Sequence, residues 1–298
     1  MNNLEKDINN ISPKFVSDLN RDVSKMMDKS ALFYRSFARV KTSRSVQHKF
    51  NIKNYNSEKK MQDLFGVRIA LYFKDDIPIC QKIIESTFNV VDISKDMESE
   101  TVFEPVRLNY VCKLPSDIRQ MMDEIFWSSY PIDDTFEIQV RTVFSEGWHE
   151  IEHDLRYKCK NDWINENDMN RTMNGIFATL ETCDWSILSL FEQITYKKYK
   201  DSNWIAMIRN KFRIRFNSES LDKHIVEIFN SKREMAKEYL KLDREKLILA
   251  LCSNEISRIP KTMSNIIFIS NSLFVNDSDI NKITPRLIQE KCGKYKLK

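Results

Sequence analysis

The fold of this chain is decided by the stretch Phe136-Glu137-Ile138-Gln139-Val140-Arg141-Thr142, which runs into Phe144-Ser145-Glu146-Gly147-Trp148-His149-Glu150-Ile151-Glu152-His153. In the first part, apolar and polar residues alternate, and this period of two predicts a strand with one buried face. In the second part, the apolar residues Phe144, Trp148, Ile151 and Leu155 are spaced as on one face of a helix. The polar side of the strand presents Glu137, Gln139 and Arg141 together, which indicates that it holds something ionic.

The composition is that of a globular protein without a strong charge bias. The 298 residues are enough for one large core or two modest ones. With 42% hydrophobic and 30% charged residues, the chain is not expected to be disordered. The net charge of +4 does not by itself indicate nucleic-acid binding, although a local basic patch can still bind phosphates.

Several classes of protein are excluded by what the sequence lacks. No apolar leader segment is visible at the N-terminus, and no apolar run approaches the roughly 20 residues of a membrane span. The six cysteines are scattered without CxxC pairs, which predicts reduced thiols in a cytoplasmic protein. Only four glycines occur, which excludes a glycine-rich nucleotide-binding loop. Any phosphate must therefore be bound by side chains.

The hydrophobic pattern predicts an α/β (α+β) fold, in which a mixed β-sheet is flanked by helices and followed by a mostly helical C-terminal extension. The expected elements are a helical segment over 1–38, a buried strand over 67–73, a helix capped by Asp76 that runs to about residue 88, strands over 88–93 and 102–114, a helix over 115–126, a strand around Glu137, and a long helix over 168–195. The expected domains are 1–38, 39–196 and 200–298, with a linker at 197–202. Residues 232–251 have a helical pattern, and residues 266–274 fit a short helix or a strand.

A basic segment follows the N-terminal helices. Arg39 and Lys41 alternate as on a strand, and Ser45 is positioned to cap a helix that carries Lys49. Cations around a hydroxyl at a helix start suit a polyphosphate, because the helix end supplies N–H groups and the cations neutralise charge. The alternative is an ordinary solvated basic face.

Two kinds of site compete for the polar residues. The first is a zinc site, since His149-Glu150-Ile151-Glu152-His153 matches H-E-x-x-H. Arg156 and Cys159 stand where the metzincin extension needs Gly and His, so Glu181 would have to be the third ligand. The alternative to a zinc site is that His149 is simply exposed and that His153 is a hydrogen-bonded helix histidine.

The second is a magnesium–nucleotide site. Asp63 precedes one strand and Glu137 lies on another, and Mg²⁺ prefers a few carboxylates together with water and substrate phosphates. This hypothesis uses both carboxylates and also the cations that would hold a triphosphate, which are Arg39, Lys41, Lys49, Arg68 and Arg141.

Four linked motifs give the chain a family resemblance. They are Arg39-x-Lys41-x-x-x-Ser45-x-x-x-Lys49, Asp63-x-x-Gly66-x-Arg68, Glu137-x-Gln139-x-Arg141-Thr142 and Trp148-x-x-x-Glu152-His153-x-x-x-Tyr157-Lys158. In order and spacing, over about residues 30–195, they resemble the RelA/SpoT-type alarmone (ppGpp) synthetases. The resemblance implies a nucleotidyltransferase-like sheet and an enzyme that moves pyrophosphate from ATP to a ribose hydroxyl. It also makes the H-E-x-x-H match a coincidence.

The resemblance implies a role for each site residue. Asp63 would hold Mg²⁺, and Glu137 would assist the metal or act as general base. ATP and its phosphates would be bound by Arg39, Lys41, Ser45, Lys49 and Arg68. The acceptor side would be lined by Gln139, Arg141, Arg107, Asn109, His153 and Lys158.

One departure from the family concerns the acceptor. The family commonly has a Gly-Tyr-x-Ser-x-His-like segment whose tyrosine stacks on guanine, whereas Pro105 and Asn109 stand near its tyrosine and histidine here. Stacking contributes about 1–3 kcal/mol per base, so guanine recognition should weaken by about one to two decades unless Phe103 takes the place of the tyrosine.

Three outcomes stay open. The chain makes an alarmone from a guanine nucleotide, or it modifies the 3′ end of tRNA as a toxin, or it binds nucleotide as a regulatory protein without turnover. Basic surfaces at 197–200 or 209–215 would guide RNA. The C-terminal region would pack on the catalytic domain, form a homo-oligomer or bind a regulatory partner.

Overall fold

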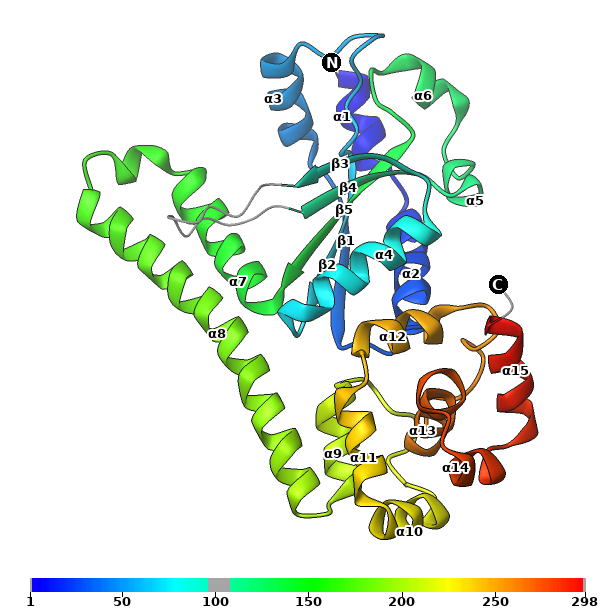
Figure 1. The fold of residues 1–298 in the computed structure, drawn as a ribbon. Coiled ribbons are helices and arrows are strands. Elements are labelled where there is room, and N and C mark those ends of the chain that lie inside the picture. Colours follow the sequence, from blue (N-terminus) through cyan, green and yellow to red (C-terminus); the bar gives the residue numbers. More distant parts are fainter. Residues whose placement is uncertain (1, 96–107, 297–298) are drawn as a thin grey trace. The chain divides into compact units, whose positions relative to one another are not determined.

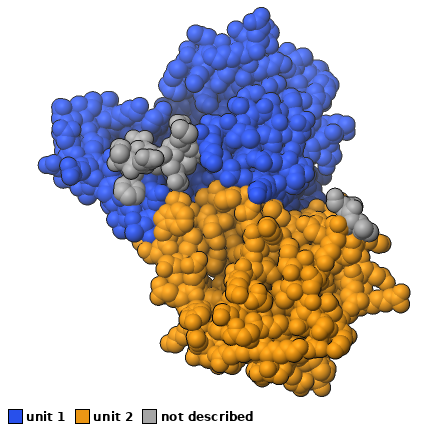
Figure 2. All heavy atoms as spheres, in the orientation of Figure 1, with its two compact units in different colours: residues 1–26, 34–72, 80–182 blue, residues 27–33, 73–79, 183–298 orange. Residues whose placement is uncertain are grey.

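The structure is a computed structural model that describes residues 2–95 and 108–296. The chain forms two compact units, drawn in different colours in Figure 2. Unit 1 comprises residues 1–26, 34–72 and 80–182, and unit 2 comprises residues 27–33, 73–79 and 183–298. Each unit therefore contains separate stretches of the sequence.

Unit 1 is built on a mixed sheet of five strands in the part of the chain that the structure describes (Figure 1). The strands are β1 (Tyr34–Val40), β2 (Phe65–Leu71), β3 (Val90–Lys95), β4 (Leu108–Lys113) and β5 (Thr135–Thr142), in the order β1-β2-β5-β4-β3. The central β2 and β5 run parallel, and the other neighbours pair antiparallel. This is the mixed α/β sheet that the sequence predicts.

The sheet has one apolar and one polar face, because burial alternates along β1, β4 and β5 and along β2 as far as Ile69. On β5, Phe136, Ile138 and Val140 are buried, whereas Glu137, Gln139 and Arg141 are partly exposed. Helices cover the apolar face: α2 (Pro13–Asp28) places Phe15 with its ring 4.4 Å from that of Phe65. Phe88, just after α4 (Ile77–Thr87), packs edge-on against Phe136 of β5, with the two ring centroids 5.5 Å apart. The polar face is therefore the one that can bind a ligand.

The other helices of unit 1 are short, apart from the start of a long one. They are α1 (Asn2–Asn9), α3 (Ser43–Lys53), α5 (Ser116–Arg119), α6 (Glu124–Ser129) and α7 (Val143–Glu152), followed by a π-helical turn at His153–Tyr157 and a 3-10 turn at Lys160–Trp163. The long helix α8 (Asn167–Lys200) begins in unit 1 and continues into unit 2.

Three local predictions in unit 1 are wrong. The expected helix over 1–38 stops at Asp28, and Tyr34–Val40 is a strand, because its alternating burial fits the sheet edge. The expected helix over 115–126 is two short helices, α5 and α6. The cap of α3 is Thr42, whose side chain accepts from the Ser45 N–H, so Ser45 lies inside the first turn.

Unit 2 is helical, as expected for the C-terminal region. Its helices after α8 are α9 (Trp204–Phe212), α10 (Lys223–Ser231), α11 (Arg233–Lys241), α12 (Arg244–Cys252), α13 (Met263–Ser270), α14 (Ser278–Ile283) and α15 (Arg286–Lys296), with a π-helical turn at Asn271–Val275. The expected linker is wrong, because residues 197–200 belong to α8. The pattern over 232–251 is two helices, and the undecided stretch at 266–274 begins as the end of α13.

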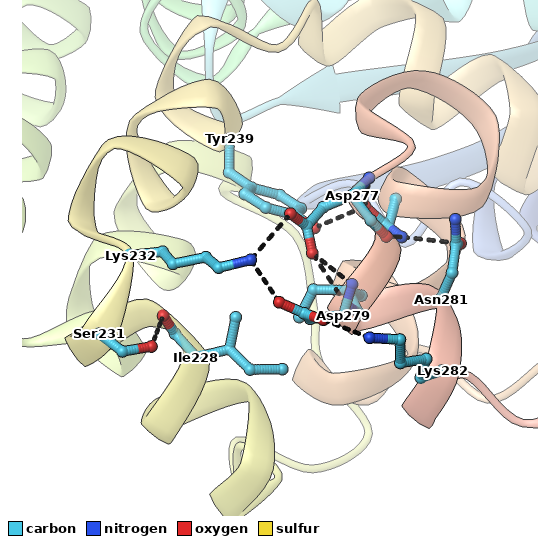
Figure 3. Close-up of polar contacts among 10 residues, drawn as sticks. Ile228, Ser231, Lys232, Tyr239, Asp277, Asp279, Asn281 and Lys282 are labelled. Carbon is cyan, nitrogen blue, oxygen red and sulfur yellow. Dashed lines mark hydrogen bonds and ion pairs between the residues drawn. The ribbon is translucent and has the colours of Figure 1, made fainter.

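Polar contacts join the helices of unit 2, as Figure 3 shows for Lys232. The Lys232 ammonium contacts the Asp279 carboxylate and lies 4.0 Å from Asp277 Oδ2, and Asp279 also pairs with Lys282 at 2.8 Å. Asp277 accepts the N–H groups of Asp279 and Ile280 and so caps α14. This cluster ties the start of α11 to α14.

The predicted cap Asp76 has a different role. It lies in a 3-10 turn (Lys74–Asp76), is fully buried in unit 2, and pairs with Arg244 at the start of α12. Among the described residues, no helix is long and apolar enough to span a bilayer.

Candidate active site

The polar face of the sheet brings the predicted residues of four strands together. In the register of β2 and β5, Gly66 stands opposite Glu137, Arg68 opposite Gln139 and Ala70 opposite Arg141. On the other side of β5, Asn109 of β4 stands opposite Gln139. Arg39 is exposed on the edge strand β1, opposite Gly66. The alternation of each strand thus places these side chains on one surface.

Asp63, in the loop before β2, is the centre of a first cluster. Its Oδ2 accepts the ammonium groups of Lys41 and Lys49, each at 2.5 Å. All three side chains are partly buried, with exposed fractions of 19% to 35%. The cluster has two positive charges for one negative charge, so it is suited to a further anion.

Burial and charge act in opposite directions in this cluster. Burial alone would raise the pKa of Asp63, but the charges and hydrogen bonds of Lys41 and Lys49 outweigh burial and hold this pKa below its usual value. Burial lowers the pKa of Lys41, and Asp63 offsets only part of that. Burial also opposes the charge of Lys49, but there the contact with Asp63 is stronger and the pKa is raised.

Glu137 is the centre of a second cluster. Its Oε1 accepts from Asn109 Nδ2 at 2.9 Å and its Oε2 accepts from Gln139 Nε2 at 2.6 Å. Gln139 in turn accepts from Arg68 Nε at 2.9 Å. Two amides from neighbouring positions thus orient one carboxylate on the polar face.

Two carboxylates that the sequence argument did not assign complete this cluster. Arg68 Nη1 donates to Glu146 Oε1 at 2.8 Å and also contacts Glu150, and Glu146 Oε2 lies 3.6 Å from Arg141 Nε. Arg68, Arg141 and Glu146 are nearly buried, at 11% to 13% exposure. Because Glu146 and Glu150 are four residues apart on α7, their shared helix face was the signal that could have identified them.

A ladder of rings extends from the arginines along α7. The rings of His149 and His153 stack at 5.6 Å, and those of His153 and Tyr157 at 5.8 Å. Burial, followed by the charges of Arg141 and Arg68, lowers the pKa of His149 to about 3. His149 is therefore neutral at physiological pH.

The H-E-x-x-H match does not form a zinc site in the structure. Glu150, its general base, contacts Arg68, and the two imidazoles stack on each other. Across residues 2–95 and 108–296, no three His, Cys, Asp or Glu side chains are grouped to hold a metal ion, so Glu181 does not join the histidines. The zinc hypothesis thus lacks its third ligand.

The remaining acceptor-side predictions fall in different places. His153 Nδ1 lies 2.9 Å from Asp154, whose carboxylate also pairs with Lys158 at 2.6 Å. Lys158 is more than half exposed. Arg107, Phe103 and Pro105 lie outside the described residues.

The donor set suits a hard cation such as Mg²⁺. Both lysines bond Oδ2 of Asp63, and no contact from the described residues to its Oδ1 is present. Glu137 adds a second carboxylate, fixed by amides and not by a cation. Oxygen ligands of this type are those that Mg²⁺ takes together with phosphates and water.

Comparisons with known proteins point to one family. Residues 38–162 match the family model described as "Region found in RelA / SpoT proteins". No curated protein sequence matches the chain.

Solved structures show a weaker likeness. Small alarmone synthetase 1 from Bacillus subtilis is 24% identical, with a TM-score of 0.46 over 59% of this chain and 89% of that one. Small alarmone synthetase 2 from the same organism is 19% identical, with a TM-score of 0.48 over 61% and 96%. A GTP pyrophosphokinase family protein from Streptococcus pneumoniae is 20% identical, with a TM-score of 0.45 over 58% and 85%. These values are too low to transfer a substrate or a residue role.

Proposed function

We propose that this chain is a magnesium-dependent pyrophosphokinase that uses ATP, because its residues 38–162 match the family model of the region found in RelA / SpoT proteins. The match supports a (p)ppGpp-type pyrophosphokinase at the level of the family. The transferred group is the β,γ-pyrophosphate of ATP, and the acceptor is a ribose hydroxyl. The chain would be active as a transferase on a nucleotide or on the 3′ end of an RNA.

The observation that carries the proposal is the excess of positive charge at Asp63. Two ammonium groups share one carboxylate oxygen, so a second anion can be bound without removing either lysine. ATP supplies such an anion, and the ammonium groups of Lys41 and Lys49 would contact its phosphates while they remain beside Asp63. Bound Mg²⁺ would be held by Asp63 and Glu137 and would neutralise charge on the phosphates.

Glu137 is the proposed general base. Asn109 and Gln139 donate to its two oxygens and fix its orientation, which leaves further lone pairs for a hydroxyl proton. In the proposed step, the acceptor oxygen forms a bond to the β-phosphorus of ATP. The bond from this phosphorus to the oxygen that bridges it to the α-phosphate breaks, AMP leaves, and the hydroxyl proton passes to Glu137.

Arg68 and Arg141 serve the same site in this proposal. Arg68 is held by Glu146 and Glu150, and Arg141 lies beside Glu146, so the two guanidinium groups are positioned before a ligand binds. From this position Arg68 would bind ATP, together with Arg39 and Ser45, while Gln139 and Arg141 would line the acceptor side. The two guanidinium groups are then preorganised by the fold, so ligand binding does not have to order them.

A regulatory protein without turnover is the second candidate. The observation in its favour is that Arg68 is already occupied by two carboxylates, which would compete with ATP. Such a protein would bind nucleotide and transfer nothing.

One experiment separates the candidates. The full chain is incubated with Mg²⁺, ATP labelled in the β- and γ-phosphates, and GDP, GTP or deacylated tRNA, and label transfer to each acceptor is measured. Transfer to GDP or GTP indicates alarmone synthesis, and transfer to tRNA indicates the toxin activity. Binding of ATP without transfer to any acceptor would refute the enzyme and support the regulatory protein.

Two variants make this assay specific. Glu137→Gln keeps the shape and an oxygen for Asn109 but removes the base, so it should lose transfer and keep ATP binding. Glu124→Gln, on an exposed carboxylate of α6 that pairs with Arg119, is the matched control and should leave transfer unchanged. If Glu137→Gln transfers as fast as the unaltered chain, the assignment of the base is wrong.

A further inference from the structure

Unit 2 contains a cavity of about 350 Å³. Its walls come from the ends of α8, α9 and α11, the start of α12 and the turn at Lys74–Asp76, and the lining residues all belong to this unit. Cavities that hold nothing are usually apolar. This one is lined by three cations and two carboxylates, which are Lys211, Arg213, Arg244, Asp75 and Glu192. It therefore has the character of a binding site and not of a packing defect.

The two arginines of this cavity already have partners. Arg213 pairs with Asp75. Arg244 contacts Asp76, and its Nη1 lies 3.5 Å from Asp75 Oδ2. Both arginines are buried. Two carboxylates thus balance two guanidinium groups, and these four side chains form a fixed wall.

Lys211 adds a third positive charge that has no counter-ion of its own. In the part of the chain that the structure describes, no hydrogen bond or ion pair reaches its ammonium group, although the side chain is half-buried. Burial lowers the pKa of Lys211, and the charges of Arg213 and Arg244 lower it further. The attraction of Glu192 offsets only part of this. The protein alone thus destabilises the charged form of Lys211, and a bound anion would stabilise it.

The same cavity offers acceptors that lack donors. Glu192 is exposed, and none of the described residues forms an ion pair or a hydrogen bond with its carboxylate. Asp75 Oδ1 is buried, and no described residue donates to it. A ligand that fits both signs accepts a hydrogen bond from the Lys211 ammonium group and donates one to a carboxylate.

We propose that this cavity binds a phosphate group, with Lys211 as its cation and Glu192 as the acceptor of an O–H group of the ligand. The proposal concerns unit 2 alone and does not depend on the transferase activity.

The O–H group distinguishes phosphate from other anions. A phosphate oxygen accepts from an ammonium group in a short, charge-assisted hydrogen bond. Inorganic phosphate also keeps a proton at about pH 7, and small phosphate monoesters carry hydroxyl groups, so both can donate to Glu192. Sulfate has no such proton, and its negative charge would face that of the Glu192 carboxylate.

The volume of the cavity limits the ligand to a compact molecule. Small-molecule sites span roughly 300–1,000 Å³, so this cavity is at the lower end of the range. Leu240 and Tyr196 also line it and supply carbon surface beside the charged wall, which suits a short carbon skeleton attached to the phosphate. We therefore expect inorganic phosphate or a small phosphate monoester, and no nucleoside polyphosphate.

Chemical labelling of the full chain tests the site directly. The unaltered chain is treated with a trace of acetic anhydride, and acetylation of each lysine is followed by mass spectrometry as inorganic phosphate is added at constant ionic strength. At a phosphate concentration of about ten times Kd, acetylation of Lys211 should slow by about tenfold. Lys237, an exposed lysine of α11, is the internal control and should react at the same rate throughout. No protection of Lys211 up to about 50 mM phosphate, equal protection of Lys237, or protection of Lys211 by GDP and not by phosphate would overturn the proposal.

Equilibrium dialysis with labelled phosphate tests the role of Lys211. Lys211→Met should weaken binding by at least about tenfold, because a charge-assisted contact is lost. The fold should tolerate this change, since the ammonium group has no partner among the described residues. Lys237→Met is the matched control and should bind as the unaltered chain does. Lys49→Ala, on the polar face of unit 1, should also keep this binding, which separates it from phosphate held beside Asp63. Equal binding by Lys211→Met and Lys237→Met would refute the site.

Competition between anions tests the choice of ligand. Sulfate should bind at least about tenfold more weakly than phosphate, and Glu192→Gln should narrow this difference, because the acceptor of the O–H group loses its charge. Glycerol 3-phosphate identifies the source: tighter binding than inorganic phosphate supports a phosphorylated metabolite, and weaker binding supports free phosphate. Sulfate that protects Lys211 as well as phosphate does would show a site for any anion and overturn the assignment of phosphate.

Discussion

The charges around Asp63 are unequal at the scale of single residues. One of its oxygens takes two ammonium groups, while the charge of the cluster stays positive. Neither lysine is next to Asp63 in the sequence: Lys41 follows β1 and Lys49 lies on α3. Since α3 starts at the Thr42 cap, the position of this cap sets where Lys49 points.

The Lys49→Ala variant tests this cluster. Loss of one charge-assisted contact to a phosphate costs about 1.5–3 kcal/mol, so kcat/KM for ATP should fall by about 10- to 100-fold. The control is Lys53→Ala, an exposed lysine at the end of the same helix, which should keep full activity. Equal activity of the two variants would show that Lys49 does not bind ATP.

The lowered pKa of His149 predicts that the free energy of unfolding decreases in acid. Its pKa falls from an ordinary 6.5 to about 3 on folding, mainly through burial and then through the charge of Arg141. Between these values, the unfolded chain binds more protons than the folded chain, so the free energy of unfolding falls as pH is lowered from 6.5 toward 3. The contribution of one such group is at most about 1.4 kcal/mol per pH unit.

The His149→Gln variant should remove this contribution. Its free energy of unfolding should depend less steeply on pH over the same window than that of the unaltered chain, as measured by denaturant unfolding at several pH values. An equal or steeper slope in His149→Gln would contradict the assignment of a neutral, half-buried imidazole.

At the scale of elements, the strand β5 and the helix α7 together form one part of the site. Thr142 ends the strand and caps the helix through a reciprocal bond with Ser145, so the chain turns without a loop. This turn brings Glu146 of α7 to Arg68 and Arg141 of the sheet. The strand and the helix were both predictable from their periods, whereas the contact between them depends on the turn.

The turn at Lys74–Asp76 is the corresponding anchor in unit 2. Asp76 is fully buried and pairs with Arg244, which also donates from Nε to the Phe212 carbonyl at 2.7 Å at the end of α9. Burial raises the pKa of Asp76 despite the opposing charge of Arg244. Removal of one partner would leave the other charge buried.

Arg244→Met should therefore destabilise the protein by about 3–5 kcal/mol. Denaturant unfolding of the full chain, followed by helical circular dichroism, measures this change. Lys241→Met breaks an exposed pair with Glu238 and should cost no more than about 1 kcal/mol. A loss below about 1 kcal/mol in Arg244→Met would mean that water or another group compensates the Asp76 charge.

At the scale of the whole molecule, the boundary between units does not follow the sequence. Residues 27–33 and 73–79 lie far from the C-terminal helices in sequence but belong to the same compact unit. Leu32 forms a bridge with Ile214, and Arg213 pairs with Asp75. Unit 2 is therefore not a separable C-terminal extension.

A chain that ends at residue 200 should consequently be less stable than the full chain. It keeps the polar face but leaves Leu32, Ile79 and Asp76, all buried in the full chain, without their unit 2 partners. We expect a lower Tm and rapid proteolysis near residues 27–33 and 73–79, measured by calorimetry and by mapping of the cleavage sites. A truncated chain with the same Tm and cleavage pattern would show that these segments need no C-terminal partner.

The sequence by itself determined the mixed sheet, its polar face and the resemblance to RelA/SpoT proteins. Period-two alternation identifies a half-buried strand wherever it occurs, and the four motifs that carry the resemblance lie within or near residues 38–162, which match the family model. The tertiary structure alone decided which charges meet. Arg68 contacts Glu146 and Glu150, Asp76 contacts Arg244, and residues 27–33 join unit 2. The physical reason is that periodicity describes a residue's neighbours within one element, whereas an ion pair depends on where separate elements place their side chains.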